Sequence, residues 1–106
     1  MKRVIMLGSY TLLLFLLANC GPHIGKIVTS YPVPTKEQAK TEFTEEQLAQ
    51  GRTIWQSTCD RCHDLHPETK HTPEGWNRTL RRMIHKSKLT EDEGVLVRAY
   101  LIANSK

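Results

Sequence analysis

The chain has 106 residues, with 15 Lys and Arg against 11 Asp and Glu, and three cysteines. This length allows a single small domain, and three cysteines are not the even set that a disulfide framework requires. Two basic residues lie in a predicted export signal; without them 13 basic residues stand against 11 acidic ones, so the formal charge falls from +4 to +2. The sequence has no long run of like charges, which argues against a polybasic arm and a nucleic-acid partner.

The N-terminus has the features of an export signal. Lys2 and Arg3 precede an apolar stretch at residues 4–18, which is shorter than the about 20 apolar residues of a membrane-spanning helix. A Leu three positions and an Ala two positions before Cys20 resemble the bacterial lipoprotein signal, in which the Cys is acylated and becomes the first residue. We therefore expect a lipoprotein-type signal peptide at residues 1–19 and a lipid on Cys20.

Two other interpretations of this segment stay open. Asn19 stands where the lipoprotein pattern has Gly, Ala or Ser, and ordinary signal cleavage or an uncleaved signal anchor would also fit. In all three cases the folded part is exported. We expect it on the periplasmic side of a bacterial membrane, inner or outer, anchored there by the acyl chains on Cys20.

The segment that follows the signal shows no helical or strand periodicity. Tyr31-Pro32-Val33-Pro34 favours an extended, polyproline-like backbone, and the residues around it are small and polar. We therefore expect residues 20–42 to form the lipidated Cys and a flexible tether, in which His23 is solvated and has no partner.

Helix start signals appear from Phe43 onward. The pairs Thr44 with Gln47 and Thr90 with Glu93 are capping boxes, and Thr72 followed by Pro73 is an N-cap with Pro at the first helical position. Apolar residues recur at helical spacing after each signal. With no alternating strand pattern, residues 43–106 are predicted to be an all-α domain. About 64 residues make a marginal core, so we expect a cofactor to stabilise it.

The sequence Cys59-Asp60-Arg61-Cys62-His63 is the attachment motif of a c-type haem. The two thiols add across the two vinyl groups of the porphyrin, and the three-residue step lets both reach one edge of the ring. His63 then lies under the macrocycle, where its imidazole can bind the iron as the proximal ligand. We expect one haem c, covalently bound through Cys59 and Cys62.

Three other uses of these cysteines were considered. A zinc site would need a second ligand pair, which only His66 and His71 could supply in a cramped arrangement. A thioredoxin-like dithiol would need a βαβ context that the sequence lacks, and a plain disulfide between Cys59 and Cys62 is the simplest alternative. The coincidence of the motif with an export signal favours haem.

The motif also sits in a longer pattern. The stretch Gly51-x3-Trp55-x3-Cys59-x-x-Cys62-His63 resembles the N-terminal helix and haem site of class I c-type cytochromes, and Val97-Arg98-Ala99-Tyr100-Leu101 resembles their C-terminal helix. In that family a Gly and an aromatic residue let the two helices cross closely. The resemblance implies a small class I cytochrome c-like fold, with three main helices around the haem.

The resemblance further implies a distal Met ligand, and Met83 is the one Met outside the signal segment. The alternatives are His85, His71 and an open sixth position; Met83 could also be a core residue. Trp55 and Trp76 are candidate residues of the haem pocket, and Trp76 could donate its N–H to a propionate. Candidate partners of the propionates are Arg61, Arg78, Arg81 and Arg82.

Two functions of different classes follow. With two protein ligands on the iron, the haem has no vacant site for substrate, and we expect an electron-transfer protein rather than an enzyme, serving as a subunit or partner of a membrane or periplasmic oxidoreductase. With an open sixth position, the alternative is a haem enzyme or a gas or redox sensor.

Overall fold

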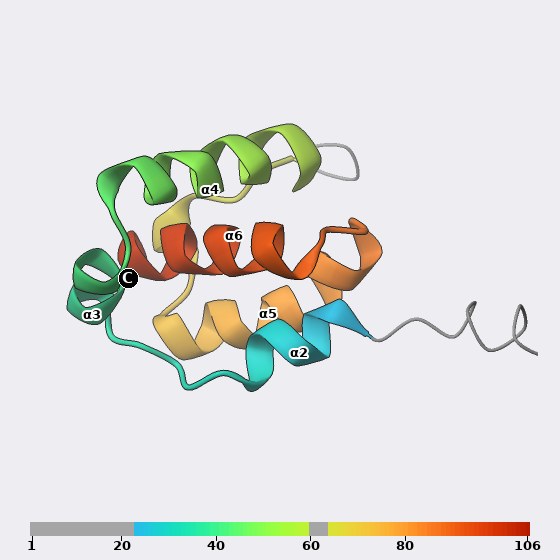
Figure 1. The fold of residues 1–106 in the computed structure, drawn as a ribbon, viewed down its shortest axis with the longest axis horizontal. Coiled ribbons are helices and arrows are strands. Elements are labelled where there is room, and N and C mark those ends of the chain that lie inside the picture. The colour runs from blue at the N-terminus through green and yellow to red at the C-terminus, as the bar shows by residue number, and fades with distance from the viewer. Residues whose placement is uncertain (1–22, 60–63) are drawn as a thin grey trace, which may run out of the picture.

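The computed structural model describes residues 23–59 and 64–106, which form helices and no strand (Figure 1). The prediction of an all-α fold is therefore confirmed for these residues. In chain order the elements are α2 (Ile24–Ser30), α3 (Lys36–Glu42), α4 (Glu45–Thr58), the 3-10 turn η2 (Glu68–Lys70), α5 (Pro73–Lys86) and α6 (Glu91–Ala103).

The predicted helix starts are confirmed. Reciprocal capping boxes join Thr44 to Gln47 at α4 and Thr90 to Glu93 at α6. The Thr72 hydroxyl accepts a hydrogen bond from the Gly75 N–H at the start of α5. Each of these caps satisfies backbone N–H groups that have no partner inside the helix, which is why the three helices begin at these residues.

Helix α6 is the centre of the fold. It runs between α4 on one side and α2 and α5 on the other (Figure 1), and α3 also packs against it. Its residues Val97, Leu101 and Ile102 are fully buried. An apolar helix can be buried on nearly all sides only when neighbouring helices cover each of its faces. Among the described residues, α2, α3, α4 and α5 provide this cover for α6.

Helices α4 and α6 cross with their backbones in contact. A Cβ built on Gly51 would come within 2.1 Å of the Leu96 carbonyl oxygen, which lies on α6. One turn further along α4, the Trp55 ring lies 5.7 Å from the Tyr100 ring, centroid to centroid, at an interplanar angle of 45°. Only glycine fits at position 51 of this crossing.

The prediction of a flexible tether is wrong for its described part. Residues 24–42 contain α2 and α3, and α2 packs against both α5 and α6. The backbones of α2 and α5 are in contact, because a Cβ on Gly25 would lie 1.8 Å from the Arg81 carbonyl oxygen. The Asn77 side chain also donates to the Thr29 carbonyl. The packed helical unit therefore includes α2 and α3, which lie before the predicted boundary at Phe43.

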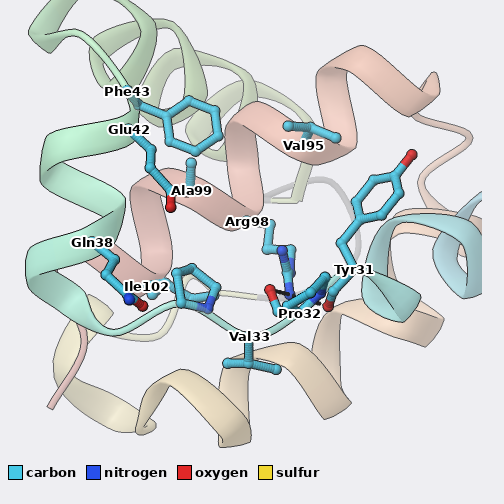
Figure 2. A pocket seen from close by; sticks show the side chains of 11 residues that line it. Tyr31, Pro32, Val33, Gln38, Glu42, Phe43, Val95, Arg98, Ala99 and Ile102 are labelled. Carbon is cyan, nitrogen blue, oxygen red and sulfur yellow. Dashed lines mark hydrogen bonds between the residues drawn. The ribbon is translucent and has the colours of Figure 1, made fainter.

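The segment that joins α2 to α3 lies along a pocket of about 450 Å³ (Figure 2). The Arg98 side chain, which is 8% exposed, donates to the carbonyl oxygens of Tyr31 and Pro32 and to the Asn77 side chain. Burial lowers the pKa of this guanidinium. Arg98 thus fixes the extended segment to α6 through two hydrogen bonds and ties α6 to α5 through the third, none of which the sequence indicated.

Candidate haem site

Helix α4 leads directly into the predicted attachment motif. Cys59 is the C-cap of α4, where its backbone N–H donates to the Trp55 carbonyl. Its side chain is buried, with 4% exposure. Cys62 and His63 lie outside the described residues, as does the lipidation candidate Cys20. Of the three residues predicted to hold the haem, the structure therefore places Cys59.

Cys59 belongs to the apolar cluster that forms the core. Both tryptophans predicted for the haem pocket, Trp55 and Trp76, are buried in this cluster, and Leu65 packs against it from the segment after the motif. Burial, reinforced by the negative charge of Glu68, raises the pKa of the Tyr100 phenol in the same cluster. Cys59 thus belongs to a core that is apolar and rich in aromatic side chains, which are the surroundings that a porphyrin ring favours.

Trp76 fixes the segment that follows the motif. Its indole N–H donates to the Glu68 carbonyl at 2.7 Å, and its ring meets the His71 ring edge-on at 4.8 Å and 83°. In this structure the N–H is therefore used by the backbone of η2 and not held for a propionate. The hydrogen bond ties η2 to α5.

The candidate distal ligands lie in different surroundings. Met83 is half-buried and packs against the same cluster as Cys59. His85 is exposed on the other side of α5, where its ring stacks on His23 with centroids 3.7 Å apart. His71 is half-buried against Trp76, and burial, reinforced by the nearby cation of Lys70, lowers its pKa. Met83 packs against the cluster that contains Cys59, and His71 contacts the same cluster through the Trp76 ring, whereas His85 lies on the solvent side of α5.

The arginines suggested as propionate partners are directed to the surface. Arg78, Arg81 and Arg82 are exposed, and they line a shallow cleft with His23 on the outside of α2 and α5. This side of α5 is opposite to the buried Leu80 and Ile84. Their role as propionate partners stays a prediction, and Arg61 lies outside the described residues.

The described residues fit a covalently attached haem in two respects. A buried thiol stands at the end of α4, and a thioether, a ligand suited to haem iron, packs against the same apolar cluster. Within residues 23–59 and 64–106 no three His, Cys, Asp or Glu side chains gather as a candidate metal site. No helix in the described ranges has the length and apolar character needed to span a membrane.

Comparison with models of known protein families, with curated proteins and with solved structures finds no match for this chain. The assignment of a function therefore depends on the residues themselves.

The sequence did not indicate two contacts between the α2 segment and α5. The first is the stack of His23 on His85, which brings together residues 62 positions apart. The second is the close contact of Gly25 with Arg81. Neither has a local signal, because each depends on α2 folding back onto α5.

Proposed function

We propose that this chain is a monohaem c-type cytochrome of the class I kind that carries single electrons. Cys59 and Cys62 would hold the haem covalently, and His63 and Met83 would bind its iron. The observation that carries the proposal is the position of Cys59: the attachment motif begins at the C-terminus of α4, with its first thiol buried in the core that Met83 also contacts.

When bound, the haem supplies reversible one-electron exchange between ferric and ferrous iron. The chain's own residues have three tasks. The Cys59 backbone, hydrogen-bonded to Trp55, holds the first attachment point at a fixed place at the end of α4. The buried side chains of Trp55, Trp76 and Leu80 exclude water from that side of the site. The Trp76 N–H donates to the Glu68 carbonyl and thereby holds η2 against α5.

The thioether of Met83 is suited to the distal position for an electrochemical reason. A thioether stabilises ferrous iron and raises the reduction potential relative to a second imidazole. His85 already stacks on His23 at the surface, so recruiting it would require breaking that contact and turning the side chain around α5. Ligation by Met83 leaves the His23–His85 stack intact.

The redox partners are proteins, and we propose a membrane or periplasmic oxidoreductase as the partner. A lipid on Cys20 would hold the cytochrome at the outer face of a bacterial membrane. Sharing one membrane surface with the partner raises the local concentration of each, so tight binding between them is not required.

The first experiment tests haem attachment. The full chain is produced in a bacterium with a c-type haem maturation system, and the product is denatured, separated on a gel and stained for covalently bound haem. We expect a haem-positive band for the natural sequence, loss of the stain for Cys59→Ser with Cys62→Ser, and retention for Ser57→Ala, an exposed position on the same helix. A natural chain without covalent haem would contradict the proposal.

The second experiment tests the distal ligand. We expect a low-spin spectrum with the weak near-infrared band of methionine–iron ligation, and loss of that band in Met83→Ala. The matched control is His85→Ala, which should retain the band because His85 is exposed. A high-spin spectrum that shifts with carbon monoxide in the natural chain would support the haem enzyme or sensor instead. Labelling with a fatty acid, compared with Cys20→Ala, tests the anchor separately.

A further inference from the structure

Helix α5 carries a row of basic side chains on its solvent side. Arg78, Arg81, Arg82, His85 and Lys86 are all exposed, and their spacing of three and four residues places them on one face, opposite to Trp76, Leu80 and Ile84. The one acidic residue of α5 is Glu74, in its first turn. This helix therefore presents a single sign of charge over most of its exposed length.

Helix α2 extends this row. It lies beside α5 (Figure 1), and its residues Ile24–Ser30 include the exposed Lys26 and no carboxylate. Between the two helices His23, Arg78, Arg81 and Arg82 line a shallow cleft of about 420 Å³. We call the half-buried His23 together with the exposed side chains of Lys26, Arg78, Arg81, Arg82, His85 and Lys86 the basic face.

The neighbours of His23 confirm the excess of positive charge. After burial, the groups that lower the pKa of His23 are His85, Lys26 and Arg81, and each acts as a nearby cation. A cleft walled by guanidinium groups and an imidazole suits a phosphodiester, because guanidinium groups donate paired hydrogen bonds to phosphate oxygens.

The position of the basic face along the chain suggests what covers it. His23 lies three residues after Cys20, and three fully extended residues span about 11 Å at most. A lipid on Cys20 would therefore hold His23 within about that distance of the headgroups. An uncleaved apolar segment at residues 4–18 would place it nearly as close.

We propose that the basic face docks against the anionic phospholipid headgroups of the membrane that holds the anchor, so that α2 and α5 lie along the lipid surface. This inference depends on the proposed anchor at Cys20. It differs from the flexible tether expected from the sequence: the domain has a fixed orientation at the membrane, and α4, on the other side of α6, is directed away from the lipid.

The experiment compares lysine reactivity on two membranes. The mature, lipidated chain with its haem is reconstituted into vesicles of phosphatidylcholine alone and into vesicles in which about a third of the lipid is phosphatidylglycerol. Lysines are acetylated with a water-soluble reagent, and the rate at each site is read by mass spectrometry. Lys26 and Lys86 report on the basic face, and the exposed Lys40 and Lys70 are references on α3 and η2.

We expect acetylation of Lys26 and Lys86 to be at least about threefold slower on the anionic vesicles, with Lys40 and Lys70 unchanged. Salt at about 1 M, where the screening length is only about 3 Å, should remove the difference. Replacing Arg78, Arg81 and Arg82 together by Gln should also remove it. In the matched control, Gln replaces three basic residues that are exposed elsewhere, Lys40, Arg52 and Lys106. This variant should retain the difference in acetylation rate of Lys26 and Lys86, with Lys70 as the reference.

Equal rates for Lys26 and Lys86 on both vesicles would overturn the docking, and would leave the basic face to an acidic protein. Equal slowing of all four lysines would overturn it too, because the contact would not be confined to α2 and α5. The anchor has its own readout: a lipidated chain floats with the neutral vesicles whether or not the basic face docks. Failure of the anchor and failure of the docking are therefore distinguishable.

Discussion

The Leu96 carbonyl oxygen lies where the side chain of any residue larger than glycine would begin at position 51. A Cβ at this position would be 2.1 Å from that oxygen and 3.0 Å from the Cβ of Tyr100. Both obstacles belong to α6, and the nearer one is backbone, which cannot move aside by changing a rotamer. The crossing of α4 and α6 therefore depends on this one missing side chain.

We expect Gly51→Ala to destabilise the protein by about 2 kcal/mol or more, because the methyl group forces the two helices apart. In an unobstructed helix the same change would be stabilising, since alanine is the better helix former. Urea unfolding followed by circular dichroism measures the difference, with the exposed neighbour Gln50→Ala as control. A variant as stable as the natural chain would show that α4 and α6 do not cross at this distance.

A second glycine tests whether the segment before Phe43 is folded. A Cβ on Gly25 would collide with the Arg81 carbonyl, so Gly25→Ala should release α2 from α5. Hydrogen exchange read by mass spectrometry should then be faster in α2 and unchanged in α4 and α6. The exposed Lys26→Ala is the control. Unprotected α2 amides in the natural chain would instead favour the flexible tether.

The buried Arg98 gives a third prediction. Replacing it by Met keeps the approximate volume but removes the donors to Asn77 and to the carbonyls of Tyr31 and Pro32. We expect a loss of about 1–3 kcal/mol in the free energy of unfolding, the usual cost of buried polar groups left without partners. Arg52→Met, at an exposed position of α4, should change it little. Equal effects of the two substitutions would contradict this role for Arg98.

The pKa of His23 gives a dependence on pH. Burial and the cations around it lower the pKa of His23 below 6.5, the value for an unfolded chain. Below pH 6.5 the unfolded chain therefore binds more protons at this histidine than the folded chain does. The contribution of His23 to the free energy of unfolding is fully present above about pH 6.5 and is lost as the solution becomes more acidic. His71, whose pKa is also lowered by burial, contributes with the same sign.

Urea unfolding at pH 7.5 and at pH 5.0 measures this effect. His23→Asn removes the titrating ring but keeps a side chain that can accept the Lys26 N–H at the helix start, so it should lose less stability on acidification than the natural chain. His66→Asn, at an exposed position next to Lys70, should change the dependence less, because His66 is only a lesser cause of the lowered pKa of His71. An unchanged pH dependence in His23→Asn would contradict the lowered pKa.

The predictions that the structure confirmed concern local features. The Thr-x-x-Gln/Glu pairs at Thr44 and Thr90 each fix a helix start within four residues, so the sequence contains all the necessary information. The same signal exists at Thr35 with Gln38, where a capping box begins α3. Pro32 and Pro34, just before it, favour an extended chain and so obscure this signal in the sequence.

The attachment motif, with the order of its two thiols and its imidazole, is a property of the sequence by itself, because the chemistry depends on spacing within five residues. The basic residues are different. No stretch of the sequence is strongly basic, yet α5 brings four arginines and lysines and a histidine to one face, and α2 adds Lys26 and His23 beside them. Helical periodicity could indicate the row on α5. Only the tertiary structure could complete the basic face, because its second half depends on α2 packing on α5 through Gly25, a contact between residues far apart in the chain.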